Sequence, residues 1–438
     1  MEKTAVLFKL GFKYLYRHKK RYTFLLAALV FCFGIVTFIT STKDRMYDNL
    51  YYTAQSHYAG DVVAVGYNES IGITHHLGSE ELAAIMSAVE ESAINPVNTL
   101  KRTLFGNTGA VYFNGISVVQ KYIIGCDWEN EEFVFSRMDF SSPIVHPVGD
   151  DSIVISAPVA NQLGAATGDI VILEVSNKWG QKNTGQFIVS GIVQDSSIFG
   201  YYKVYVSRLS LNRLLLFNDE DCSLIGFFFE SRSMAEENRA RLYRAMRHRI
   251  QTGSLIKNRE EMINETSWPY SWENTKVFLF TLPVYLSEID SLLNAMDLLT
   301  YLLYGVMLVI IFVSASVTYR LIMHERTREM GVMRSIGFFG GDLRMVLWTE
   351  AGILGIISIF AGFILSVLIS FGASFISFDW FPGFEIFLRS GKITALYLPG
   401  TIINNIILTL IVLAAAVIFP ALRASRKNLP SLLSGEPL

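Results

Sequence analysis

The chain has 438 residues, of which 51% are hydrophobic and only 17% are charged. This composition is too apolar for an ordinary water-soluble protein and indicates several membrane-spanning segments. The formal net charge of −2 lacks the basic excess of a nucleic-acid-binding protein. Lysine and arginine gather near the ends of apolar runs, so their positions are more informative than their number.

The first 42 residues combine a basic segment with an apolar run. Residues 1–21 interleave lysine and arginine with leucine, phenylalanine and tyrosine, which predicts an amphipathic helix at the cytoplasmic membrane surface. Nucleic-acid binding is not expected, because this segment continues directly into the uncharged run 22–41. About twenty residues at ~1.5 Å each cross a hydrocarbon core of ~30 Å. A first transmembrane helix is therefore predicted at 22–42, and no cleavage site follows it.

Three further spans are predicted at 297–322, 346–376 and 400–420, with Pro399 and Pro420 punctuating the ends of the last. Basic residues near the span ends set the orientation. The N-terminal arm, the loop 323–345 and the tail 421–438 are the basic ones, so they are predicted to be cytoplasmic. The short loop 377–399 and the long segment 43–296 are then extracytoplasmic.

The long segment is large enough for one or two globular domains, and its pattern predicts mixed α+β structure. A strand at 61–65 follows a short helix, and a helix covers 79–92 with Ser79 as its N-cap. Strands 170–175 and 186–193 are predicted to pair across the turn 177–185. The other predicted elements are a helix at 158–163, a helix at 209–217, a strand at 224–230 and a charged, exposed helix at 233–249. Residues 285–323 form either one continuous stalk and span or two helices that break near Met296.

The loop 323–345 is predicted to contain a short amphipathic helix. Apolar residues recur at i, i+3 and i+4 spacing among charged ones, and Gly337 is a helix-stop signal. The residues of this pattern are Glu325, Arg328, Glu329, Met330, Gly331, Val332, Met333, Arg334, Ile336 and Gly337. Such a helix either lies on lipid headgroups or docks on a partner protein.

The run from Glu325 to Gly337 resembles the segment that follows the second membrane helix in FtsX-like permeases. These include MacB-type and lipoprotein-releasing (LolC/LolE-type) ABC transporter subunits. The resemblance continues through Glu350-Ala351 and the glycines Gly352, Gly355 and Gly362. The runs 153–156, 163–164, 168–171 and 189–193 are similar to the extracytoplasmic core domain of that family, whereas 66–150 and 218–285 match nothing specific.

The resemblance implies a multi-pass α-helical membrane protein of the bacterial inner membrane. Four transmembrane helices carry a large α+β domain, similar to the MacB periplasmic core, between helices 1 and 2. Both termini are expected in the cytoplasm and the large domain in the periplasm. The loop helix would be a coupling helix that docks on a separate ABC ATPase. That ATPase binds ATP and Mg²⁺, so no catalysis and no cofactor or metal are expected in this chain.

By the same resemblance, two permeases, identical or related, assemble with two ATPase subunits in membrane lipid. The lipoprotein-releasing branch is the nearest, so a lipoprotein substrate and a periplasmic carrier are the implied partners. The turn 177–185 is shorter than the family's carrier-recruiting loop, and its residues do not match. The alternatives are MacB-type efflux and an FtsX-type signalling scaffold that controls cell-wall hydrolases.

Other motifs carry two interpretations each. A stripe of small residues every four positions predicts close helix packing, either within this subunit or along a substrate groove. Its members are Ser358, Gly362, Ser366, Ser370 and Ser374. Cys126 and Cys222 either pair or remain buried thiols. His75 and His76 would point to opposite faces of a strand, so joint metal ligation is not expected. Glu350 is either a functional membrane carboxylate or pairs locally.

Overall fold

This structure is a computed structural model that describes residues 19–68, 75–106, 109–144, 148–177, 179–194, 202–267, 272–287, 290–376, 387–388 and 391–426. The chain divides into two compact units. The helical unit comprises Met1–Tyr47, Leu292–Phe378 and Lys392–Leu438, and the insert unit comprises Asp48–Ser291 and Asp379–Gly391.

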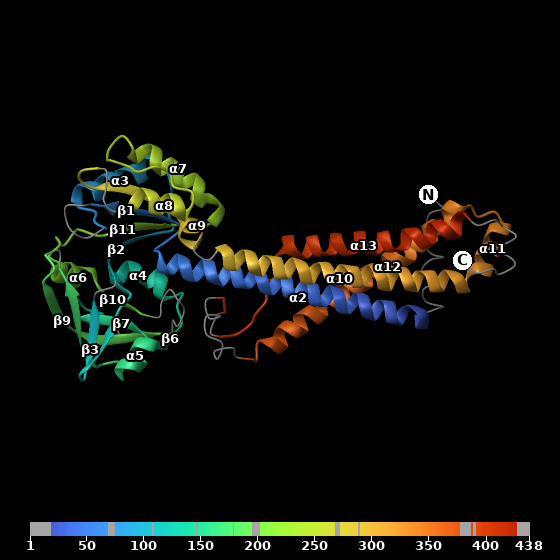
Figure 1. Ribbon diagram of the computed structural model, residues 1–438, viewed down its shortest axis with the longest axis horizontal. Coiled ribbons are helices and arrows are strands. Elements are labelled where there is room, and N and C mark those ends of the chain that lie inside the picture. Colours follow the sequence, from blue (N-terminus) through green and yellow to red (C-terminus); the bar gives the residue numbers. More distant parts are fainter. Residues whose placement is uncertain are drawn as a thin grey trace. The chain divides into compact units, whose positions relative to one another are not determined.

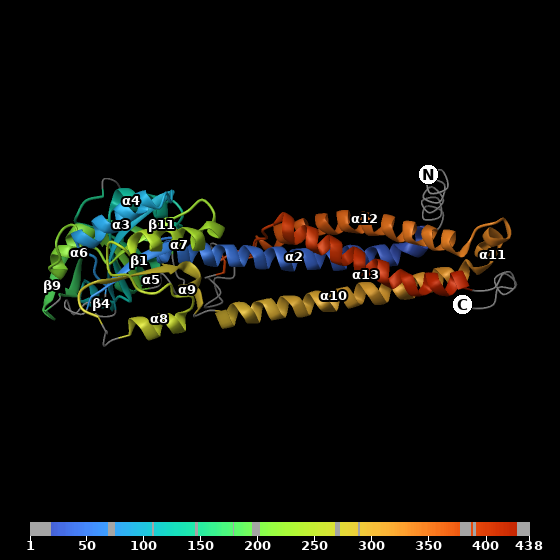
Figure 2. The same cartoon turned by 90° about the horizontal axis from the view of Figure 1, so that it is seen from above.

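Within the described residues, the helical unit contains four long helices, which run lengthwise alongside one another in two perpendicular views, and one short helix at one end of them (Figure 1 and Figure 2). They are α2 (Lys19–His57), α10 (Asp290–Glu325), α11 (Thr327–Ser335), α12 (Gly340–Ala373) and α13 (Pro399–Arg426). Among the described residues, four segments are long and apolar enough to cross a membrane: Tyr22–His57, Leu293–Glu325, Gly340–Ala373 and Pro399–Ile418. The predicted fold class, four apolar helices with an α+β insert after the first, is confirmed.

Several predicted boundaries differ from the structure. Helix α2 does not end at residue 42 and continues to His57, so no separate short helix precedes the first strand. Helix α10 begins at Asp290, not at Tyr285, and runs without a break at Met296. A separate short helix, α9 (Leu282–Leu286), starts with Pro283 in its first turn, where proline is tolerated. Residues 1–18 of the predicted basic helix lie outside the described part of the structure, and so does the tail from residue 427 onward.

Pro420 lies inside α13 and does not end it. A proline removes the hydrogen bond to the carbonyl four residues earlier, which here is Ala416. The Ser316 hydroxyl of α10 donates to this same carbonyl oxygen at 3.3 Å. A neighbouring helix thus satisfies the acceptor that Pro420 leaves free, which explains why the helix continues in an apolar bundle.

The insert unit is built on one mixed sheet of 12 strands within the described residues. The path is β12-β1-β11-β2-β5-β10-β7-β9-β8-β3-β4, and β6 pairs with β9. The β10–β5 and β7–β9 pairs are parallel, and the other pairs along the path are antiparallel. The strands are β1 (Val62–Tyr67), β2 (Asn98–Gly106), β3 (Ala110–Phe113), β4 (Ile116–Val119), β5 (Tyr122–Cys126), β6 (Phe140–Ser142), β7 (Ser152–Ser156), β8 (Ile170–Ser176), β9 (Lys182–Val193), β10 (Lys203–Ser207), β11 (Leu224–Phe228) and β12 (Lys276–Thr281).

Helices cover the two ends of this sheet separately (Figure 1). The helices are α3 (Ser79–Glu91), α4 (Trp128–Phe135), α5 (Ala157–Leu163), α6 (Arg208–Leu215), η1 (Arg232–Met234), α7 (Ala235–Met246), α8 (Arg259–Thr266) and α9. Helices α3 and α7 share a core with β1, β11 and β12. Helices α5 and α6 share another core with β3 and β7–β10.

The predicted elements of the insert appear with small shifts. The predicted pairing of 170–175 with 186–193 is present as β8 and β9, whose hairpin is longer than predicted because β9 starts at Lys182. The predicted charged helix at 233–249 is α7, which is amphipathic: its Leu242 and Met246 side chains are buried against the sheet. Gly78, not Ser79, is the N-cap of α3, and its N–H donates to the Glu81 carboxylate at 3.1 Å.

Gly226 of β11 is expected to be irreplaceable, because the turn after α2 lies directly on it. A Cβ at this position would meet the Ala59 carbonyl oxygen at 1.6 Å. Gly226→Ala should cost about 3 kcal/mol or more, since backbone cannot yield as a side-chain end can. Thermal unfolding of the solubilised chain measures the loss. Gly106→Ala, whose Cβ would have an ordinary 3.4 Å contact, is the matched strand control. Equal stability of the two variants would contradict this packing.

Candidate functional site

The predicted loop helix is present as α11, between α10 and α12. The Arg326 N–H donates to the Ile322 carbonyl and the Met330 N–H to the Arg326 carbonyl, both at 3.0 Å, so the helical pattern continues through the junction. Gly337 has a φ of 99°, and the Phe338 N–H donates to the Met333 carbonyl at 3.1 Å. This is the geometry of a glycine helix end. The segment therefore stops where the sequence predicts.

The apolar residues predicted on one face of α11 divide between two environments. Met330 and Met333 are buried, in a core shared with Ile322, Met323 and Leu343 of the neighbouring helices. Val332 and Ile336 are 52% and 70% exposed. The exposed apolar side chains of this segment are therefore Val332 and, directly after α11, Ile336, whereas the two methionines pack α11 against its own bundle.

The remaining predicted loop residues have the following positions. Glu325 is exposed at the end of α10, and Gly331 is buried in α11. Glu329 is half exposed and accepts from Arg326 Nε at 3.4 Å. Arg328 and Arg334 belong to α11, but their side chains lie outside the described part of the structure. The docking role of these residues stays a prediction.

A buried charge network lies beside α11. Arg326 Nη1 donates to both oxygens of Glu350 on α12, at 3.0 and 3.2 Å. The Tyr22 hydroxyl at the start of α2 donates to Glu350 Oε2 at 2.7 Å. Glu350 is fully buried, and the Arg326 side chain is 7% exposed. A buried carboxylate requires such a partner, because an unpaired charge in this environment is costly.

The network joins the start of α2 to α12 and to the junction of α10 and α11, and Tyr22 and Glu350 are 328 positions apart in the sequence. Tyr22 also contacts the Tyr319 ring of α10 edge-on, with ring centroids 6.4 Å apart. Thr327, the first residue of α11, donates its hydroxyl to the Met323 carbonyl at 3.0 Å. The sequence pointed to Glu350 and to the charged loop that contains Arg326, but it did not indicate that the two pair or that Tyr22 joins them. A carboxylate at the edge of an uncharged run implies a buried cation nearby, and that signal could have identified Arg326 within the loop.

The stripe of small residues on α12 lies partly inside the helical unit. Ser358, Gly362 and Ser366 are buried, and Ser370 and Ser374 are half-buried. At Gly362, an added Cβ would meet the Val30 carbonyl oxygen of α2 at 2.8 Å and the Gly34 nitrogen at 3.2 Å. The small residues thus permit backbone-to-backbone approach of α12 and α2. No space for a substrate is needed to explain this part of the stripe.

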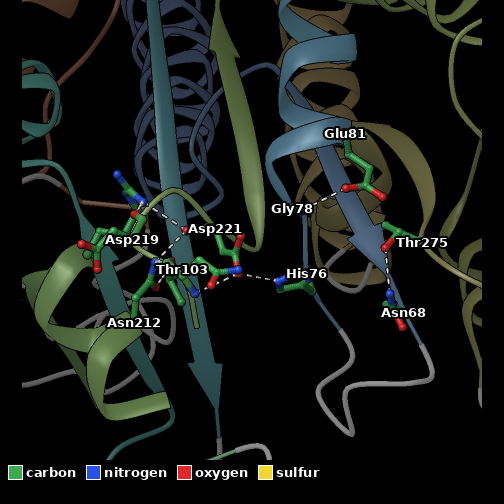
Figure 3. Close-up of polar contacts among 11 residues, drawn as sticks. Asn68, His76, Gly78, Glu81, Thr103, Asn212, Asp219, Asp221 and Thr275 are labelled. Atoms are coloured by element: carbon green, nitrogen blue, oxygen red, sulfur yellow. Dashed lines mark hydrogen bonds and ion pairs between the residues drawn. The ribbon is translucent and has the colours of Figure 1, made fainter. Parts of the chain in front are cut away.

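The other sequence motifs lie in the insert unit and have local partners. Figure 3 shows His76 directed at Asp221, with His76 Nε2 and Asp221 Oδ2 3.0 Å apart. His75 contacts the Tyr67 ring, and burial lowers the pKa of His75 to about 4. Among the described residues, no group of three or more His, Cys, Asp or Glu side chains is arranged to hold a metal ion. Cys126 and Cys222 are buried, free thiols.

Comparisons with known proteins give one family match and two structural likenesses. Residues 301–429 match the FtsX-like permease C-terminal family, a range that includes α11, α12, α13 and most of α10. This match supports assignment of the C-terminal helices to the FtsX-like class of membrane permeases. No curated protein matches the chain.

The insert unit is similar to two solved structures at low scores. One is the periplasmic region of MacB from Actinobacillus actinomycetemcomitans, with 11% identity, 54% of this chain and 95% of that chain covered, and a TM-score of 0.32. The other is a domain of a protein described as a permease, from Porphyromonas gingivalis, with 11% identity, 52% and 90% coverage, and a TM-score of 0.28. Scores this low do not support a conclusion about the domain's function.

Proposed function

We propose that this chain is the permease subunit of an ABC transporter, which passes ATP-driven movement from a separate cytoplasmic ATPase to the insert unit. The observation that carries the proposal is the FtsX-like family match over residues 301–429, because it includes the segment with the predicted coupling helix. The proposed orientation places α11 in the cytoplasm and the insert unit outside the inner membrane. Lipoprotein release is the proposed task of the movement.

Helix α11 is the proposed contact with the ATPase. Val332 is exposed on it, Ile336 is exposed directly after its last residue, and Phe339, just before α12, is 74% exposed. Helix-in-groove recognition uses a few such apolar anchors, and a small number usually dominates the binding energy. A pull on this surface would reach the bundle through Met330, Met333 and the Arg326–Glu350 pair, which attach α11 to α12.

The test is a double substitution at the exposed anchors. Val332→Glu/Ile336→Glu should lower recovery of the co-purifying ATPase about tenfold or more, because two carboxylates would enter an apolar contact. The ATPase is identified by mass spectrometry with the wild-type chain and then quantified in detergent pull-downs. Met333→Glu is unsuitable for this test, because Met333 is buried in the bundle and its loss would disturb folding.

The matched control is Ile263→Glu, which changes an isoleucine of the insert unit that is 47% exposed. It should leave ATPase recovery unchanged. Normal recovery with the α11 double variant would rule out α11 as the docking helix. The same purification addresses the substrate: enrichment of lipid-anchored proteins supports lipoprotein release, whereas an adaptor with an outer-membrane channel, or a cell-wall hydrolase, contradicts it.

A further inference from the structure

The last turns of α2 are embedded in the insert unit. Residues Leu50 and Ala54 are buried there, and the Gly60 N–H donates to the Gln55 carbonyl at 2.9 Å. The C-terminal end of an α-helix leaves carbonyl groups without intrahelical donors. It also carries a partial negative charge, which favours nearby cations. The side chains that meet this end therefore decide how firmly α2 is attached.

Arg102 supplies the main attachment. It lies on β2, its side chain is fully buried, and Nη1 donates to the Ser56 and His57 carbonyl oxygens, both at 2.9 Å. The other side of the guanidinium pairs with Glu131 of α4, through Nη2 to Oε1 and through Nε to Oε2 at 3.3 Å. The planar fork of arginine thus connects a strand and a helix of the insert to the end of α2.

A second buried cation meets the same helix end. Lys203 of β10 is 2% exposed, and its Nζ lies 2.9 Å from His57 Nδ1. An ammonium group has only donors, so Nδ1 of His57 accepts in this contact. Strands β2 and β10 lie on either side of β5 in the sheet. The two cations therefore hold the end of α2 from both sides of one central strand.

Helices α2 and α10 are attached to the insert in different ways. Helix α2 is one unbroken helix of 39 residues from Lys19, and near its other end Tyr22 bonds Glu350. Helix α10 is described from Asp290 onward, after the separate helix α9. Among the described residues, only α2 carries both a bond to the charge network of the helical unit and a buried ionic attachment in the insert sheet.

We propose that the Arg102–Glu131 pair is a fixed clamp through which α2, rather than α10, passes movement to the insert sheet. This inference rests on the proposed function and names the element and residues that transmit the motion. Arg102 is a positioning residue in this scheme. It orients the end of α2 and makes the helix and the central strands move together.

The first test measures the clamp without any partner. Hydrogen exchange of the full-length chain in detergent is compared between wild type and Arg102→Met/Glu131→Leu. Replacing both members of a buried ion pair with apolar residues often preserves folding. We expect the amides in the last two turns of α2 to exchange about tenfold faster or more, while β2 and β5 keep their protection. Unchanged exchange at the end of α2 would overturn the clamp.

Two further variants make this result specific. Arg232→Met removes an exposed arginine that pairs with Asp48 of α2 at 2.7 Å and should have little effect, as surface pairs do. Lys203→Met leaves the Arg102–Glu131 pair in place and should speed exchange at the same turns, by a smaller factor. If Arg232→Met accelerated exchange as much as the double variant does, the result would contradict a special role of Arg102.

The second test measures transmission in the complex with the co-purifying ATPase. Spin labels at Val313 of α10 and Gln186 of β9, both exposed, report the distance between the units with ADP and after vanadate trapping. We expect the wild-type distance to change, and the double variant to hydrolyse ATP without that change. If the wild-type distance does not change, the result contradicts both the proposed function and the role of the clamp. A change that persists in the double variant contradicts the clamp alone.

Discussion

Arg326→Leu is expected to destabilise the helical unit strongly, whereas Arg326→Leu/Glu350→Leu should be much milder. Among the described residues, the single change leaves the buried Glu350 carboxylate with the Tyr22 hydroxyl as its remaining hydrogen-bond partner. Breaking a buried pair by removing one partner costs about 3–5 kcal/mol, while replacing both partners with apolar residues is often close to neutral. The order of stability should therefore be wild type, then the double variant, then the single variant.

Thermal unfolding of the purified chain, read as loss of the monodisperse peak in size-exclusion chromatography, gives this order. Glu350→Leu completes the double-mutant cycle and isolates the coupling between the two side chains. Glu329→Gln is the control, since Glu329 is half exposed and its contact with Arg326 is long. If Arg326→Leu matched the wild type in stability, the network would not hold α11 to α12.

Hydropathy predicted the four apolar helices well, because it measures whether a segment is more stable in hydrocarbon or in water. It could not locate the ends of the helices, since a helix does not stop where the apolar run stops. After residue 42 the chain brings Lys43, Asp44 and Arg45, yet α2 continues to His57. Lys43 pairs with Asp297 of α10 at 3.0 Å, and the Thr401 hydroxyl of α13 donates to Asp44 at 2.5 Å. Partners from distant segments let the charged turns remain helical.

In the candidate site too, the sequence predicted the features that neighbouring residues determine and missed those that distant segments determine. The spacing of α11 and its stop at Gly337 are local, and the sequence predicted both. The burial of Met330 and Met333 depends on where α10 and α12 lie, so spacing alone placed all four apolar residues on one partner-facing surface. Tyr22 and Glu350 are 328 positions apart, and no pattern within one segment could pair them.

The insert unit was the least predictable part, for a topological reason. Strands that are distant in the sequence are neighbours in its sheet. Strand β1 lies between β12 and β11, and β2 lies between β11 and β5. Strands β2 and β12 lie in segments that matched nothing specific in the sequence, and they pair with β11 and β1 from distant parts of the chain. Alternation indicates a strand but not its neighbour, because register is set by the partner.

The last prediction concerns the contact between α2 and α12 at Gly362. Gly362→Leu should reduce recovery of folded, monodisperse protein severely, because the new side chain would meet the Val30 carbonyl at 2.8 Å and the Gly34 nitrogen at 3.2 Å. Backbone atoms of a packed helix cannot rotate away, so α2 and α12 must separate. Overpacking typically costs about 1–3 kcal/mol and more where backbone is the obstacle. Small residues are what allow membrane helices to approach this closely.

Gly352→Leu is the matched control, since it lies on the same helix and an added Cβ has nothing within 4 Å. It should be recovered like the wild type, as judged by fluorescence-detected size-exclusion chromatography of membranes solubilised in parallel. Ser366→Leu should resemble Gly362→Leu, because Ser366 is fully buried, whereas Ser370→Leu should be better tolerated at its half-buried position. Equal recovery of the Gly362 and Gly352 variants would show that α2 and α12 do not depend on this contact. The graded result would establish that the stripe acts within the subunit at Gly362 and Ser366, because added bulk at these buried positions strikes this chain's own residues.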